Sequence, residues 1–217
     1  MSLIEIIVFL PLLAALAVGL GSPARVTALG TSVVVLLLTL FTAFRFQTDV
    51  EGAFQFESSR TLLETSGFPK LSLAFGLDGM SLVLLLLSAI VMVAAMMISP
   101  KESEIKGSAR LYFVSLLLIA GGAIGAFCST DLFFLYAFHE LALIPTFLMI
   151  GIFGHGENRV RTAWTITIFL GVGSLILLVG LIIGISALEG TTFDIASLIT
   201  AAKTPGTAIA ADNQSWV

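Results

Sequence analysis

The chain has 217 residues, of which 58% are apolar and only 11% are charged, and its mean hydropathy is +1.09. A soluble domain carries roughly 25% charged residues, so this composition excludes an ordinary soluble protein and indicates an integral membrane protein. The net charge of −4 gives no basis for binding nucleic acid. We therefore expect no nucleic-acid partner, and we expect the lipid bilayer to surround most of the chain.

Six segments are long and apolar enough to cross a bilayer as helices, which takes about 20 residues each. They cover residues 3–20, 26–44, 79–99, 111–129, 131–153 and 162–188. Together they predict one all-α membrane domain over residues 1–217, with an extramembrane loop at 45–78 and a C-terminal tail at 189–217. The first segment carries Glu5 where a signal peptide would have Lys or Arg, which predicts a retained helix.

The loop at 45–78 alternates apolar residues with small or polar ones. The apolar positions are Phe54, Phe56, Leu71, Leu73, Phe75 and Leu77. A period of two is typical of half-buried strands, so one interpretation is a small β-hairpin on the outer face of the membrane domain. The other interpretation is an irregular amphipathic loop. At the end of this loop, Asp78 precedes the third apolar segment and is predicted to cap that helix.

Glycines recur in the fourth and sixth apolar segments at spacings that permit close contact between membrane helices. They are Gly121, Gly122 and Gly125 in the fourth segment, and Gly171, Gly173, Gly180 and Gly184 in the sixth. We predict that these glycines pack against neighbouring helices. In the tail, the apolar residues between Phe193 and Ile199 fall near one side of a helix, which predicts a short interfacial helix.

Lys and Arg residues are distributed unevenly between the two membrane faces that six helices define. The three short loops on one face carry six of them, namely Arg25, Lys101, Lys106, Arg110, Arg159 and Arg161. The face that holds both chain termini carries four, namely Arg45, Arg60, Lys70 and Lys203. The positive-inside rule then predicts cytoplasmic short loops in a multi-pass protein of the cell inner (plasma) membrane, with periplasmic termini if the source is bacterial.

Glu140 lies about nine residues into the fifth segment, close to the midplane of the bilayer. A carboxylate at that depth costs several kcal/mol, so an intramembrane acid is a functional-site hypothesis by default. It is either protonated and hydrogen-bonded to a neighbouring helix, or ionised and paired with a cation. The six segments contain no Lys or Arg, which leaves His139 as the one cation available at this depth in the chain.

Two neighbours of Glu140 bear on this hypothesis. Pro145 has no N–H to donate to the carbonyl of Leu141, so the helix is predicted to bend beside Glu140. Histidine side chains can pass protons. His139 is therefore either a proton relay or a satisfied core histidine, because adjacent helical residues need not face each other.

Motifs for metals and cofactors are missing from the sequence. The zinc pattern H-E-x-x-H fails because Leu143 stands where its second histidine belongs. The sequence also lacks a P-loop, a dinucleotide fingerprint, a CxxC pair and a haem motif. We therefore expect no metal, cofactor or redox site in this chain, so the energy for any ion movement would come from a gradient or from partner subunits.

The segment DLFFLYAFHELALIPTFLMIGIFG, residues 131–154, resembles the fifth-helix signature of the antiporter-like membrane subunits of respiratory complex I. The closest resemblance is to the NADH–quinone oxidoreductase subunit M and ND4 family, and FGLDGMSL, residues 75–82, is similar to the start of its third helix. The resemblance implies that Glu140 exchanges protons with a lysine on a seventh helix. It also implies that NADH, FMN, iron–sulfur clusters and quinone bind to partner subunits, and that other membrane-arm subunits are partners.

Subunits of this family have many more spanning helices than six, arranged as two inverted repeats. The resemblance therefore implies the N-terminal part of such a subunit, or a subunit split between two chains. We expect a proton-translocating membrane-arm subunit of NADH–quinone oxidoreductase, with Glu140 as the proton-transfer group. One alternative is a subunit of a multisubunit cation/proton antiporter or membrane-bound hydrogenase. The other is a structural scaffold subunit in which Glu140 only packs.

Overall fold

The computed structural model describes residues 2–47, 54–63, 70–105, 107–187 and 192–203, and most of them are helical. Six helices can cross a membrane by length and composition: α1 (Leu3–Leu20), α2 (Ala24–Arg45), α3 (Gly79–Ile98), α4 (Ala109–Cys128), α5 (Leu132–Leu148), which continues as the π-helix η2 (Met149–Phe153), and α6 (Arg159–Ala187). Strands β1 (Gln55–Leu63) and β2 (Leu71–Leu77) form an antiparallel hairpin. The short helices are η1 (Glu102–Glu104) and α7 (Ile195–Lys203). The predicted all-α membrane fold with a small hairpin is confirmed.

Polar residues at the helix ends explain where these helices start. Asp78 accepts a hydrogen bond from the Ser81 N–H at 2.7 Å and caps α3, as predicted. Helices α4 and α6 begin before the predicted apolar runs, and their first turns contain Arg110, Arg159 and Arg161. A span predicted from hydropathy stops at the first charged residue. The helix itself can start earlier, because the first turn of a membrane helix can extend into water.

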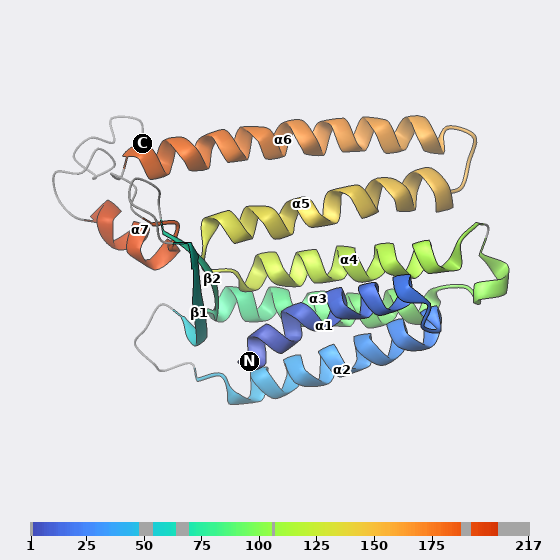
Figure 1. Cartoon of the computed structure of the whole chain (residues 1–217), viewed down its shortest axis with the longest axis horizontal. Helices are drawn as coiled ribbons and strands as arrows, with labels where there is room; N and C mark the ends of the chain where they lie inside the picture. The colour runs from blue at the N-terminus through green and yellow to red at the C-terminus, as the bar shows by residue number, and fades with distance from the viewer. Residues whose placement is uncertain (1, 48–53, 64–69, 106, 188–191, 204–217) are drawn as a thin grey trace.

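The spanning helices lie side by side, with α6 along one edge of the bundle and α2 along the other (Figure 1). The hairpin, α7 and the start of α1 lie at one end, and the α1–α2, α3–α4 and α5–α6 loops lie at the opposite end (Figure 1). The core is built mainly from α1, α3 and α4, and it includes Phe75 and Leu77 of β2 and Phe138 of α5. Helix α6 packs mainly against α5 and η2, so the α5–α6 side is the least enclosed part of the bundle.

The glycines of α4 and α6 differ in how closely other parts of the described chain approach them. A Cβ on Gly122 would lie 2.8 Å from the Phe138 carbonyl oxygen, and one on Gly125 would lie 2.6 Å from Cγ of the Phe138 ring. The predicted close packing is therefore confirmed for α4, which α5 approaches tightly at Phe138. It is wrong for α6 within the described chain, because a Cβ on Gly180 or Gly184 would meet nothing within 4 Å.

Backbone hydrogen bonds join the hairpin to two other segments at the same end of the bundle. We call this assembly the end layer; it comprises β1, β2, residues 129–132 and residues 192–195. Thr130 N–H donates to the Ala74 carbonyl at 3.1 Å, Leu132 N–H donates to the Phe193 carbonyl at 2.9 Å, and Ile195 N–H donates to the Thr130 carbonyl at 2.9 Å. The end layer therefore ties the start of α5 to both the hairpin and α7.

Strand β2 departs from the predicted alternation of buried and exposed residues. All of the residues from Ala74 to Leu77 are buried. The Phe75 ring contacts the Phe9 ring of α1 and the Phe138 ring of α5. A Cβ on Gly76 would lie 2.9 Å from the Thr130 side chain. The second half of β2 is thus enclosed on both faces, because α1, α5 and residues 129–132 all pack against it.

Candidate functional site

Asp131 fixes the start of α5, the helix that carries Glu140. Only 1% of Asp131 is exposed, and its Oδ1 accepts hydrogen bonds from the N–H groups of Phe133 and Phe134 at 3.0 and 3.2 Å. Its Oδ2 faces the Ser72 N–H of β2 at 3.4 Å. Burial raises the pKa of the Asp131 carboxyl group, these N–H donors oppose the rise, and the nearby charge of Asp194 adds to it. Sequence analysis missed this role, because nothing local distinguishes a buried cap from an exposed one.

Glu140 itself is partly enclosed in the described bundle. Its side chain is 30% exposed, whereas its Oε1 atom is buried and has no hydrogen-bond partner among the described residues. His139 Nδ1 lies 3.7 Å from this oxygen, which is within the distance of an ion pair but too long for a hydrogen bond. The structure therefore brings together two neighbours that helix geometry alone does not require to meet.

The cation expected opposite an ionised Glu140 does not come from Lys or Arg in the described part of the chain. In that part, the ion pairs within 4.0 Å are Arg60 with Glu5 and His139 with Glu140. A buried acceptor without a donor costs about 1–3 kcal/mol. The site around Glu140 is thus open to a further donor or cation.

Pro145 is buried inside α5, and the helix continues past it to Leu148. Thr146 Oγ1 donates to the Ala142 carbonyl at 2.7 Å, and the Met149 N–H faces the carbonyls of Pro145 and Thr146. The five-residue π-helix η2 follows directly. π-Helical turns are rare and often mark functional positions, and the sequence pattern gave no sign of this one. The predicted bend beside Glu140 stays a prediction.

A second acidic site, at Glu5, went unrecognised in the sequence. Glu5 lies in the first turn of α1, is 3% exposed, and receives Arg60 Nε and Nη2, each at 3.0 Å, one on each carboxylate oxygen. Ser58 Oγ donates at 2.6 Å and the Ser2 N–H at 3.1 Å. The capping-box spacing of Ser2 and Glu5 was a usable signal for the helix start. The sequence gave no signal for the partner Arg60, because Arg60 lies 55 residues from Glu5.

Comparison with known proteins assigns a class to this arrangement. Residues 129–215 match the family described as "NADH:quinone oxidoreductase/Mrp antiporter, TM". The matched region contains Glu140, Pro145, η2 and α6. The chain is thus similar in sequence to the antiporter-like membrane subunits, the class that the fold also indicates.

More particularly, the relatives are subunit M and chain 4 proteins. The chain is 32% identical to NADH-quinone oxidoreductase subunit 13 of Thermus thermophilus, covering 87% of this chain and 37% of that protein. It is 33% identical to F(420)H(2) dehydrogenase subunit M of Methanosarcina mazei, covering 85% of this chain and 35% of that protein. The corresponding values for NADH-ubiquinone oxidoreductase chain 4 of Marchantia polymorpha are 28%, 89% and 39%. The recognition of the subunit M and ND4 family from sequence is confirmed.

The fold gives the same result. A chain in the structure "Respiratory complex I from Thermus thermophilus with bound NADH" matches with a TM-score of 0.73 and 26% identity. The match covers 92% of this chain and 40% of that one. The chain therefore spans well under half the length of the relatives it matches, and it has the architecture of a complex I membrane subunit over almost its whole length.

Proposed function

We propose that this chain is a membrane-arm subunit of a proton-translocating NADH:quinone oxidoreductase and that Glu140 transfers protons within it. The observation that carries the proposal is the setting of Glu140. It lies in a spanning helix matched by the family, with one buried carboxylate oxygen that no described residue satisfies. Intramembrane acids of this kind are rare and mark ion pathways.

In the proposed mechanism, the protonation of Glu140 depends on a cation brought by a covering helix. Approach of the cation favours the ionised carboxylate and releases one proton, and its withdrawal allows one proton to be taken up again. A relay role for His139 is supported by its Nδ1 atom lying 3.7 Å from Glu140 Oε1, a distance that a small rearrangement would close to a hydrogen bond. Electron transfer from NADH through FMN and iron–sulfur clusters to quinone belongs, in this proposal, to partner subunits of the complex.

Glu140→Gln in the assembled membrane complex tests the proposal. Gln keeps the shape of the side chain but cannot release a proton, so we expect proton translocation to fall by roughly 100-fold or more. The measurements are the pH gradient formed across vesicles and the rate of quinone reduction, taken together. Glu157→Gln is the matched control, because Glu157 is an exposed carboxylate in the loop before α6. In Glu140→Gln, an unchanged rate of quinone reduction together with an unchanged ratio of protons translocated to electrons transferred would contradict the proposal and favour the scaffold alternative.

His139 has its own test. His139→Gln removes a side chain that can take up and release a proton, so a relay role predicts slower translocation with an altered pH profile at the same quinone affinity. A structural role predicts a lower amount of assembled complex with an unchanged pH profile. The two outcomes separate because a proton relay affects the rate at which the assembled complex works, and packing affects how much of it assembles.

The cation/proton antiporter is the second candidate function, because the matched family description names the Mrp antiporter as well as the oxidoreductase. The subunits that purify with this chain discriminate between the two. A quinone-reducing module predicts translocation that stops when the electron donor is withheld. An antiporter predicts Na⁺-dependent or K⁺-dependent proton movement without any electron donor.

We also propose an orientation for the chain. The three short loops at one end of the bundle would face the cytoplasm, and the end layer would face the periplasm if the source is bacterial. The supporting observation is the excess of Lys and Arg in the short loops. Single cysteines placed at Ser103 and at Ser59 test it. A membrane-impermeant thiol reagent added to intact cells should label the cysteine at position 59 and not the one at 103.

A further inference from the structure

A pocket of about 440 Å³ opens at the short-loop end of the bundle, far from the end layer. It lies between the α3–α4 connection, the first turn of α4, the end of η2 and the start of α6. The residues that give it chemical character are Glu104, Tyr112, Ile152, Phe153, His155 and Arg159. None of them takes part in the site around Glu140.

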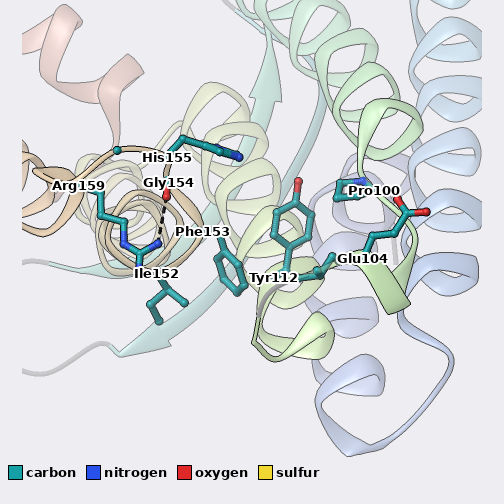
Figure 2. A pocket seen from close by; sticks show the side chains of 10 residues that line it. Pro100, Glu104, Tyr112, Ile152, Phe153, Gly154, His155 and Arg159 are labelled. Carbon is teal, nitrogen blue, oxygen red and sulfur yellow. Dashed lines mark hydrogen bonds between the residues drawn. The ribbon is translucent and has the colours of Figure 1, made fainter.

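Charges of opposite sign line opposite sides of this pocket. Figure 2 shows Arg159 and His155 on one side, Glu104 on the other, and the rings of Tyr112 and Phe153 between them. The two rings meet edge to face, with centroids 5.1 Å apart. Arg159 Nη1 donates to the Gly154 carbonyl at 3.4 Å, which uses one of the five N–H donors of the guanidinium group. The pocket therefore has a cationic side and an anionic side separated by an aromatic wall.

The pocket also lies at the level where the helices leave the apolar part of the membrane. Helix α3 ends at Ile98, the α5–η2 helix ends at Phe153, and α6 starts at Arg159. The side chains of Ile98 and Ile152 are exposed near these ends. A ligand that has one polar end and long apolar chains would meet matching surroundings at this level, with its polar end in the pocket.

We propose that this pocket binds the headgroup of a zwitterionic phospholipid such as phosphatidylethanolamine. The phosphate lies against Arg159 and His155, because guanidinium donors bind phosphate strongly. The ammonium lies toward Glu104, over the faces of Tyr112 and Phe153, which attract a cation. A purely anionic headgroup fits less well, because Glu104 repels it without any compensating ammonium group. This inference concerns a different site and stands independently of the proposed role of Glu140.

The test compares lipid retention by the full chain in nanodiscs of equal phosphatidylethanolamine and phosphatidylglycerol content. Native mass spectrometry counts the lipids that remain bound. We expect the wild-type chain to retain phosphatidylethanolamine in preference, and Glu104→Gln to lose about fivefold of that preference, as one surface ion pair implies. Arg159→Gln should weaken retention of both lipids. Glu157→Gln and Arg161→Gln, which change neighbouring charges outside this pocket, should leave both unchanged.

A second measurement uses the wild-type chain, so it tests the proposal even if the variants fold poorly. A photoactivatable phosphatidylethanolamine added to the wild-type chain should crosslink to the peptides that contain Ile152, Phe153 and Tyr112, and unlabelled phosphatidylethanolamine should compete. Soluble phosphoethanolamine at millimolar concentration should not compete, because it lacks acyl chains. Equal retention of both lipids by the wild-type chain, equal effects of Glu104→Gln and Glu157→Gln, or crosslinks confined to other helices would each overturn the proposal.

Discussion

Replacing Glu5 by Gln should loosen the hairpin from α1, because Glu5 is the buried acceptor of a four-donor cluster. Two of its donors are the Nε and Nη2 atoms of Arg60, and a third is the Ser58 hydroxyl at 2.6 Å. A hydrogen bond to a charged group contributes about 1.5–3 kcal/mol. The Arg60 side chain is 58% exposed and regains water when it is released, but four donors lose their charged acceptor together, so we place the cost at the upper limit, about 3 kcal/mol.

Hydrogen exchange of the β2 amides measures this cost directly, because they open when the hairpin separates from α1. Since about 1.4 kcal/mol corresponds to a factor of ten, Glu5→Gln should lower the protection of these amides by roughly 150-fold. Arg60→Gln should have an effect at least as large, because it leaves the Glu5 carboxylate buried without its cation, and a buried charge without a partner typically costs about 3–5 kcal/mol. Arg45→Gln is the control, since the contact that the Arg45 side chain makes within the described part of the chain is a cation–π contact with Phe41. It should change protection by less than about fivefold.

The double variant decides whether the pair itself carries the effect. If Glu5 and Arg60 act through their mutual contact, the double variant should cost less than the sum of the single ones, by about 1–2 kcal/mol. Strict additivity, or β2 protection in Glu5→Gln within threefold of wild type, would refute the reasoning. The buried carboxylate would then contribute nothing that a neutral amide does not.

Two further predictions concern the packing and capping of α5. Gly125→Ala should destabilise the chain by about 1–3 kcal/mol, because its Cβ would overlap the Phe138 ring. Gly180→Ala, which meets nothing within 4 Å, should be neutral or slightly stabilising in the same thermal-unfolding assay. Burial raises the pKa of Asp131, so the folded state binds more protons and its stability falls as pH rises from the ordinary carboxyl pKa to the higher folded value. Asp131→Asn should remove that fall, so its stability relative to wild type should be highest at neutral pH and shrink on acidification.

The parts of the fold that sequence could predict depend on local composition. Each spanning helix is a run of apolar residues, and a bilayer requires such runs to be helical because no water is present to satisfy the backbone. The Asp78 cap was predictable for a similar reason, since it precedes an apolar run directly. Glu140 was noticeable because a single acid interrupts one of these runs, and its isolation from Lys and Arg followed from counting the spans.

The features that sequence analysis missed depend on contacts between distant segments. The partner of Glu5 lies in a strand, and Asp131 becomes buried only when Ser72 and Asp194 are brought beside it. Residues 129–131 and 192–194 carry no strand pattern of their own, because they form isolated β-bridges with distant segments, such as Ser129 with Phe75 and Asp131 with Asp194. The close packing predicted for the glycines of α6 was wrong within the described chain. Glycine spacing shows that another helix can approach closely, and it does not show whether such a helix is present.

Two parts of the described chain lack protein neighbours, the Oε1 atom of Glu140 and the outer surface of α6. Glu140 Oε1 has no hydrogen-bond partner among the described residues, a Cβ on Gly180 or Gly184 would meet nothing within 4 Å, and Phe169 and Ile176 of α6 are 76% and 68% exposed. Apolar side chains alone would be stable against lipid, but a carboxylate at that depth costs several kcal/mol, a large part of the 5–15 kcal/mol that stabilises a typical domain. A helix that places a cation beside Glu140 would remove this cost. The cost of leaving Glu140 unpaired would then favour assembly with that helix, so Glu140→Leu should make the isolated chain more stable and, under the proposed function, should weaken proton transfer.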